Sequence, residues 1–123
     1  MASEGLHEAS ELLDETTINH HRALTSLIEE LEAVDWYDQR VKATEDSSLA
    51  AVLAHNRDEE KEHASMTLEW LRRRDPALDR FLRTYLFTSE PITELEAVAE
   101  PSVGEGDRLR SDSLGIGSLK GNE

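Results

Sequence analysis

Residues 24–34 of the sequence read LTSLIEELEAV. Its apolar side chains recur three and four positions apart, at Leu24, Leu27, Ile28, Leu31 and Val34. This spacing is typical of one face of an amphipathic α-helix. Because neither proline nor glycine occurs between His7 and Lys42, the sequence predicts one long helix over that range.

A polar break and a second helical stretch follow, and together they predict a hairpin. Residues 43–48 interrupt the apolar pattern, and Asp46 or Ser47 can cap the next helix through a side-chain oxygen. A second helix is expected from about Ser48 to Arg74, because apolar residues again share one stripe and three arginines favour a C-terminus there. Two long helices joined by a short turn form an antiparallel pair.

The rest of the chain changes character in two steps. Asp75 and Pro76 read as the cap and first turn of a shorter third helix, which ends near Leu86. Glycines then gather near the C-terminus, and no aromatic residue follows Phe87. The sequence therefore predicts a helical domain, a flexible linker and a terminal peptide over residues 1–87, 88–112 and 113–123.

The composition limits both the size of the core and the kind of partner. With 123 residues, of which 37% are apolar, the chain can build one small domain and leaves room for a partner surface. Thirteen Lys and Arg stand against 27 Asp and Glu, and the net charge of -14 argues against nucleic acids and anionic membranes. Because cysteine is absent, carboxylates and imidazoles are the strong metal ligands, a set that suits iron, manganese, calcium or zinc.

The sequence also predicts a location. Residues 1–7 lack the basic and apolar blocks of a signal peptide, and no stretch approaches the roughly 20 apolar residues of a membrane span. We expect a cytoplasmic protein that does not enter a membrane.

Glu60 and His63 are the first candidate metal ligands. They stand three residues apart in the second predicted helix, so both project from one face. This is the Glu-x-x-His element of di-iron bundles. The pair continues the stripe of Leu53, Asn56 and Thr67, where a bound metal removes the cost of burying an unpaired carboxylate. Spacing alone also allows an ordinary pair on a solvated helix face.

Glu30 interrupts an apolar stripe on the first predicted helix. The residues that share its face are Ala23, Leu27, Val34 and Tyr37. Either Glu30 reaches water at the edge of the hairpin or it binds a metal, and its spacing favours neither alternative. The interruption on the facing stripe of the second helix favours the metal site.

The choice among the glutamates of the second helix stays open on spacing. Glu59 and His63 are also helical neighbours, four residues apart. A second stripe on the same helix contains Val52, His55, Glu59, Glu62 and Met66. Either stripe can supply the carboxylate that joins His63.

Counting ligands predicts a dimer. A di-iron bundle needs a Glu from each of two helices and a Glu-x-x-His from each of the other two. This chain has one of each, so two copies related by a two-fold axis would complete the ligand set and a four-helix bundle. The bridging carboxylates would hold two irons close together, so that each gives one electron to one bound oxidant. The expected chemistry is the oxidation of ferrous iron.

Three segments resemble the signature segments of the encapsulated ferritins. Residues 29–40 read EELEAVDWYDQR, residues 55–63 read HNRDEEKEH and residues 83–88 read RTYLFT. The resemblance implies an all-α fold, in which an antiparallel two-helix hairpin plus a short third helix dimerises into a ferritin-like four-helix bundle. It further implies a ring of five such dimers and a ferroxidase activity at a di-iron centre.

The resemblance also implies roles for individual residues. The ferroxidase ligands would be Glu30, Glu60 and His63, and Tyr37 would lie beside the centre. Without the resemblance, Tyr37 could simply fill the bundle with its hydroxyl bonded to a neighbour, and Trp70 is expected to be core packing.

The resemblance implies two further metal sites, on residues that are less specific to a metal-binding role. Glu29 and Glu32, with Trp36 nearby, would form an acidic site through which metal ions enter at a second subunit interface. An outer site, for calcium or another divalent ion, would consist of His55, Glu59 and Glu62. In a chain this acidic, both groups also fit ordinary solvated helix faces.

The C-terminal run SLGIGSLKG, residues 113–121, resembles the cargo-loading peptide of encapsulin cargo proteins. It places Leu114, Ile116 and Leu119 on a backbone rich in glycine, where no core requires them. The resemblance implies that these side chains dock into pockets on the inner wall of an encapsulin shell, tethered by the linker. The alternative is a disordered C-terminus without a partner.

These features predict a ferroxidase that is carried inside an encapsulin nanocompartment in the prokaryotic cytoplasm. Two helices per chain enclose no cavity for mineral, so the shell would store the iron that this protein oxidises. A rubrerythrin-like peroxide scavenger on the same di-iron site is one alternative, which differs in oxidant and electron donor. The non-enzymatic alternative is an acidic helical interaction protein whose glutamates solubilise it or bind metal.

Overall fold

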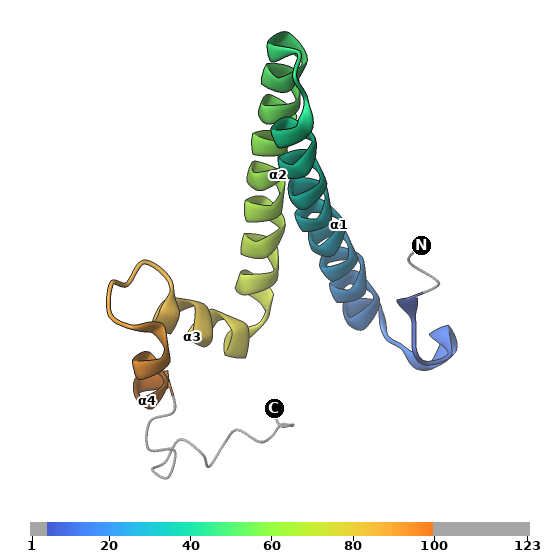
Figure 1. Cartoon of the computed structure of the whole chain (residues 1–123). Coiled ribbons are helices and arrows are strands. Elements are labelled where there is room, and N and C mark those ends of the chain that lie inside the picture. The colour runs from blue at the N-terminus through green and yellow to red at the C-terminus, as the bar shows by residue number, and fades with distance from the viewer. Residues whose placement is uncertain (1–4, 100–123) are drawn as a thin grey trace. The chain divides into compact units, whose positions relative to one another are not determined.

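The computed structural model describes residues 5–99, and within them every regular element is helical (Figure 1). The elements are the 3-10 helix η2 (Ser10–Leu12), α1 (Glu15–Ala43), α2 (Ser47–Arg74), α3 (Pro76–Tyr85), the 3-10 helix η3 (Ile92–Leu95) and α4 (Glu96–Ala99). The prediction of an all-α chain with two long helices and a shorter third one is confirmed. None of the helices in the described range is both long enough and apolar enough to cross a membrane.

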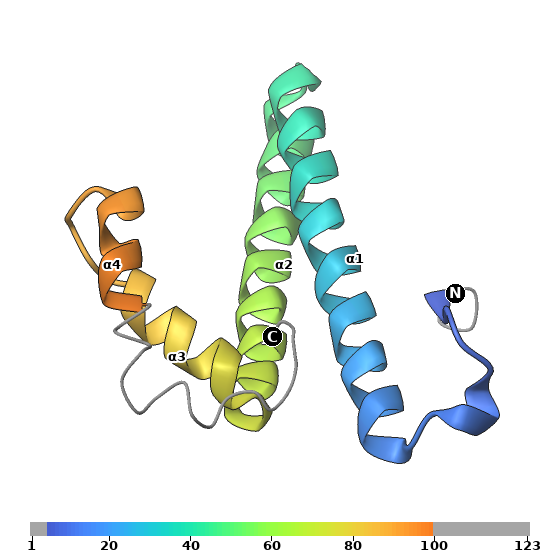
Figure 2. The ribbon, with the colours of Figure 1, turned by 90° about the horizontal axis from the view of Figure 1, so that it is seen from below.

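α1 and α2 lie side by side and run in opposite directions (Figure 1 and Figure 2). At the end of α1, the Thr44 N–H donates a hydrogen bond to the Arg40 carbonyl oxygen at 2.9 Å. Asp46 then precedes α2, and its side chain accepts a hydrogen bond from the Leu49 N–H at 2.9 Å. The bond satisfies an N–H group that the first helical turn leaves without a partner. The predicted turn and its cap at Asp46 are therefore confirmed.

The first long helix begins later than the sequence pattern suggested. α1 starts at Glu15 and not near His7, because Asp14 is extended and its side chain accepts a hydrogen bond from the Thr17 N–H at 2.8 Å. A capping residue of this kind marks the start of a helix. The prediction was wrong here because a lack of proline and glycine permits a helix without fixing where it begins.

An ion pair joins the two long helices near their turn. Arg57 Nη1 of α2 donates to Asp38 Oδ1 of α1 at 3.1 Å, and Arg57 Nε donates to Asp58 Oδ1 at 3.1 Å. The hydrogen bond from Arg57 lowers the pKa of Asp58 below its usual range. Figure 2 shows the helices close together at this end and further apart toward the start of α1.

The hairpin buries very little of its apolar surface. Among the described residues only Ala64 and Leu71 are buried apolar side chains, with 7% and 3% of their surface exposed. The large apolar residues of α1 and α2 that stay exposed are Leu24, Ile28, Leu31, Trp36, Leu49, Val52 and Met66. Because fully burying one such side chain is worth about 1.5 to 3 kcal/mol, the hairpin leaves much stabilisation to contacts with another surface.

The chain divides into two compact units at residues 76 and 77, and α3 leads into the second unit. At the end of α3, the Leu86 N–H donates to the Leu82 carbonyl oxygen at 2.9 Å. Phe87 then takes a left-handed conformation with φ of 62°, which is uncommon for an aromatic residue. Thr88 Oγ1 donates to the Tyr85 carbonyl oxygen at 2.8 Å, which completes the turn after the helix.

The stretch predicted as linker, 88–112, contains regular structure in its described part. η3 and α4 occupy residues 92–99. Residues 100–123 lie outside the described residues, and with them the side chains of the predicted cargo-loading peptide, Leu114, Ile116 and Leu119.

Candidate metal centre

His63 lies between two carboxylates of α2. Its Nδ1 is 3.6 Å from Glu60 Oε1, and its Nε2 is 4.0 Å from Glu59 Oε1. Both contacts follow from helical spacing, because residues three and four positions apart are neighbours on the helix surface. Two ligands of one first-row metal ion, each about 2 Å from it, stand roughly 3 Å apart. The Glu60–His63 pair therefore needs only a small adjustment to share an ion.

Glu59 also reaches the preceding turn of α2. His55 Nε2 is 3.7 Å from Glu59 Oε2, so a row of side chains runs from His55 through Glu59 and His63 to Glu60. This row joins the predicted ferroxidase pair to part of the predicted outer site. Glu62, the remaining member of that outer site, is exposed. Both glutamates remain within reach of His63, as the spacing had left open.

One carboxylate oxygen of Glu30 is buried and has no hydrogen-bond partner. Among the described residues, Glu30 Oε1 is the one buried side-chain oxygen or nitrogen atom that has no hydrogen-bond partner. An unpaired buried carboxylate oxygen is costly, and a bound cation offsets that cost. Because Oε1 is turned away from water, the placement of Glu30 fits a metal ligand better than an edge residue that reaches solvent.

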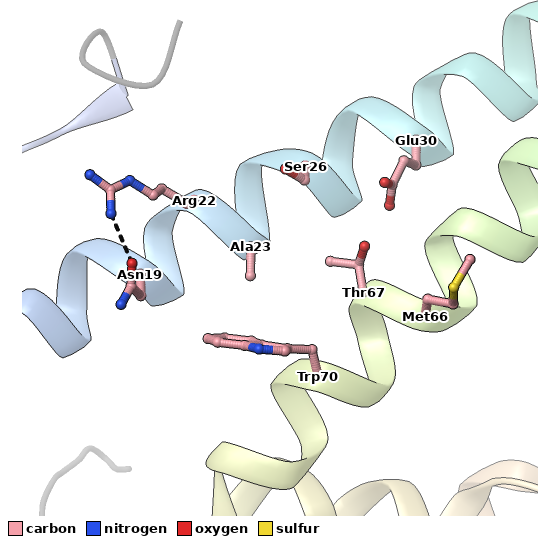
Figure 3. Close-up of a pocket in the computed structure, with 8 residues that line it drawn as sticks. All are labelled: Asn19, Arg22, Ala23, Ser26, Glu30, Met66, Thr67 and Trp70. Carbon is pink, nitrogen blue, oxygen red and sulfur yellow. Dashed lines mark hydrogen bonds between the residues drawn. The ribbon is translucent and has the colours of Figure 1, made fainter.

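Glu30 lines a groove of about 470 Å³ between α1 and α2 (Figure 3). The lining residues are Asn19, Arg22, Ala23, Ser26, Glu30, Met66, Thr67 and Trp70. In Figure 3, Met66 and Thr67 of α2 lie across the groove from Glu30 of α1. Thr67 Oγ1 donates to the His63 carbonyl oxygen at 3.2 Å. The groove wall thus includes the helical turn that follows His63.

Trp70 lies at the end of the groove away from Glu30 (Figure 3). The Arg74 guanidinium is 3.9 Å from its ring centroid, and the His20 ring meets it edge-on at 5.8 Å between centroids. Trp70 is half-buried and lines the groove, whereas the sequence predicted core packing. Sequence reasoning missed the groove, although the small residues Ala23 and Ser26, one helical turn apart, were an available signal.

The residues implied for metal entry share the outer face of α1. Glu29 and Glu32 are exposed, and Trp36 has 52% of its surface exposed. Tyr37 is half-buried, with the Arg40 guanidinium 5.6 Å from its ring centroid. The exposed face therefore combines two carboxylates with an accessible aromatic ring.

Within residues 5–99, no three histidine or carboxylate side chains of a single chain come together in a group that could hold a metal ion. The chain presents its candidates in two parts, a Glu60–His63 pair on α2 and the Glu30 carboxylate on α1.

The C-terminal turn of α2 carries a separate ion-pair cluster. Hydrogen bonds from Arg72 and then Arg73 lower the pKa of Glu69 to about 2, and the shortest of these bonds are 2.7 Å. This carboxylate is therefore held by arginines of its own helix. Its partners make it a structural pair and not a metal ligand.

A family model described as EncFtn-like matches residues 5–89 of the chain. An encapsulated ferritin-like protein of Rhodospirillum rubrum is 58% identical over 98% of this chain and 91% of that protein. A ferritin-like protein of Thermotoga maritima is 56% identical over 80% of this chain and 82% of its own length.

Two further proteins are similar. The encapsulin nanocompartment cargo protein EncC of Myxococcus xanthus is 40% identical over 74% of this chain and 76% of that protein. The crystal structure of a Nitrosomonas europaea protein superposes with a TM-score of 0.70 and 60% identity, covering 72% of this chain and 97% of that chain.

Proposed function

Because the chain belongs to the EncFtn-like family, we propose that it is a ferroxidase, which oxidises Fe(II) to Fe(III) with dioxygen at a di-iron centre shared by two copies. The resemblance to encapsulated ferritins is confirmed by this membership, and with it an encapsulin-associated, ferritin-like role. The observation that carries the proposal is the buried, unpaired Glu30 Oε1 in the groove beside the His63 turn.

Two copies related by a two-fold axis supply two Glu30 carboxylates and two Glu60–His63 pairs. Four carboxylates then carry a charge that two ferrous ions balance, while the histidines stay neutral as metal ligands. The exposed apolar residues of α1 and α2 that do not line the groove support this pairing, because a second hairpin covers them and forms a four-helix bundle.

The residues have distinct tasks in the proposed reaction. Glu30 and Glu60 of the two copies hold the two iron substrates close together. Each iron also binds a ring nitrogen of one His63. Each ferrous ion gives one electron to dioxygen. The ferric iron then passes to the mineral. Tyr37, half-buried on the same face of α1 as Glu30 and two helical turns further on, borders the centre.

In this proposal, the two groups of residues outside the di-iron centre also bind metal ions. Glu29 and Glu32, beside the exposed Trp36, attract ferrous ions at a second subunit interface. His55, Glu59 and Glu62 contribute ligands to calcium or another divalent ion outside the centre, and because the three do not come together within one chain, neighbouring subunits complete that site. The 3.7 Å contact between His55 and Glu59 supports a shared ligand position there.

The assembly extends beyond the dimer. Five dimers form a ring-like homodecamer, and the C-terminal peptide with Leu114, Ile116 and Leu119 attaches it to the inner wall of an encapsulin shell. A protein named as an encapsulin nanocompartment cargo protein among the relatives supports this partner. The shell then stores the iron as mineral in the nanocompartment.

Oxygen consumption tests the proposed function. Full-length protein is given anaerobic Fe(II) and then air-saturated buffer, and iron-dependent oxygen uptake is recorded together with the appearance of Fe(III). Glu30→Gln keeps the shape of the side chain but removes its charge, so we expect it to abolish most of the uptake. The matched control is Glu45→Gln, which changes an exposed glutamate in the turn between α1 and α2.

Equal uptake by Glu30→Gln and the unchanged protein would mean that Glu30 is not a ligand. Iron binding without any oxygen uptake would instead favour a non-enzymatic metal-binding protein. Rapid consumption of added peroxide in place of dioxygen would favour a rubrerythrin-like scavenger.

A further inference from the structure

Met66 places a thioether beside the proposed iron centre. It lines the same groove as Glu30, and 58% of its surface is exposed. Met66 follows His63 by three residues on α2, so both side chains project from neighbouring positions on the helix. Figure 3 shows Met66 next to Thr67, across the groove from Glu30.

We propose that Met66 is an oxidation site, which intercepts hydrogen peroxide released at the iron centre before it attacks the metal ligands. The inference rests on the proposed ferroxidase function. Two ferrous ions give two electrons to one dioxygen molecule, which takes up two protons and leaves as hydrogen peroxide. Because Met66 lines the groove beside the centre, its thioether is the first oxidisable side chain that the released hydrogen peroxide contacts.

The reaction at Met66 is a two-electron oxygen transfer. The sulfur gives an electron pair to one peroxide oxygen, the O–O bond breaks, and the second oxygen leaves as water with both protons. The product is methionine sulfoxide. Each Met66 therefore removes one molecule of peroxide.

The other oxidisable side chain of the groove is better protected. The Arg74 guanidinium covers the Trp70 ring at 3.9 Å, and the His20 ring contacts its edge. Trp70 also lies at the end of the groove away from Glu30 (Figure 3). Met66 has neither cover nor that distance, so the groove directs peroxide to its sulfur.

The experiment measures sulfoxide at Met66 during iron turnover. Full-length protein oxidises successive additions of Fe(II) in air, with catalase in solution to remove peroxide that escapes. Digestion and mass spectrometry then quantify the gain of one oxygen atom on the Met66 peptide. A Leu31→Met variant supplies a reference methionine on α1, at a position that is 54% exposed and does not line the groove.

Added hydrogen peroxide, without iron or catalase, calibrates the intrinsic reactivity of the two methionines. Relative to this calibration, we expect turnover to favour Met66 over the reference by about ten-fold or more, because local release raises the effective concentration of peroxide. A ratio equal to the calibration overturns the inference while leaving the ferroxidase intact. Absence of Fe(II) oxidation in the same samples overturns both.

Discussion

Glu59 and Glu60 both lie within reach of His63, at 4.0 and 3.6 Å. The sequence predicted this pairing correctly because helix geometry alone fixes which residues are neighbours. It could not choose between the glutamates, since both spacings bring a carboxylate to the imidazole. The buried Glu30 Oε1 depends on how α2 packs against α1, which no single-helix pattern contains.

Substitution separates the two glutamates. We expect Glu60→Ala to slow ferrous oxidation by at least about ten-fold, because loss of an inward-facing ligand weakens both irons of a symmetric centre. Glu59→Ala should leave the rate nearly unchanged and weaken only an outer ion. The initial rate of Fe(III) formation measures both effects. A normal rate in Glu60→Ala combined with an inactive Glu59→Ala would assign the centre to the other stripe.

The positions of the helices could largely be predicted from capping residues and from charges at the helix ends. α2 begins at Ser47 and ends at Arg74, within one residue of the prediction, because Asp46 and the terminal arginines mark both ends. α1 was extended too far because its true start depends on the Asp14 side chain. η3 and α4 lie in the stretch predicted as a linker, because short helical turns depend on neighbouring structure more than on periodicity.

The cap at Asp14 makes the stability of α1 depend on pH. The hydrogen bond from the Thr17 N–H lowers the pKa of Asp14 in the folded chain. Its contribution to stability is therefore present above the unfolded pKa of about 3.9 and is lost as pH falls through the lower folded value. Asp14→Asn caps without titrating and serves as the matched control.

We expect Asp14→Ala to have a lower Tm than the unchanged protein at pH 7, with the difference shrinking as the pH falls below 4. Asp14→Asn should have a higher Tm than Asp14→Ala at every pH in this range. Thermal unfolding followed by circular dichroism measures all three proteins. A Tm difference between the unchanged protein and Asp14→Ala that grows on acidification would contradict the capping role.

At the scale of the whole molecule, the exposed apolar faces of α1 and α2 indicate that the isolated hairpin is incomplete. The short chain and its modest apolar content predict a partner surface. They could not show which faces meet a partner, because Leu24, Ile28 and Leu31 share a helix with the stripe that faces α2. Charge and periodicity describe single helices, whereas assembly depends on surfaces from both.

The terminal peptide is separable from the helical hairpin in this account. Deletion of residues 113–123 should leave ferroxidase activity unchanged and abolish loading into a co-expressed encapsulin. Each aliphatic side chain buried in a shell pocket contributes about 1.5 to 3 kcal/mol before ordering costs, so many tails on one assembly are needed for firm attachment.

A triple change of Leu114, Ile116 and Leu119 to Asp is the sharper form of this test, because it keeps the length of the tail. Co-purification with the shell should fall to background. If the triple variant still loads into the shell, the segment that binds the shell lies elsewhere in the chain.

Native mass spectrometry under anaerobic Fe(II) titration tests whether two chains share one iron centre. We predict that iron shifts the population from monomers to dimers and their multiples, that iron is retained on even-numbered species, and that Glu30→Ala removes the shift. Monomers that carry iron at every Fe(II) level, without any growth of larger species, would contradict the shared centre.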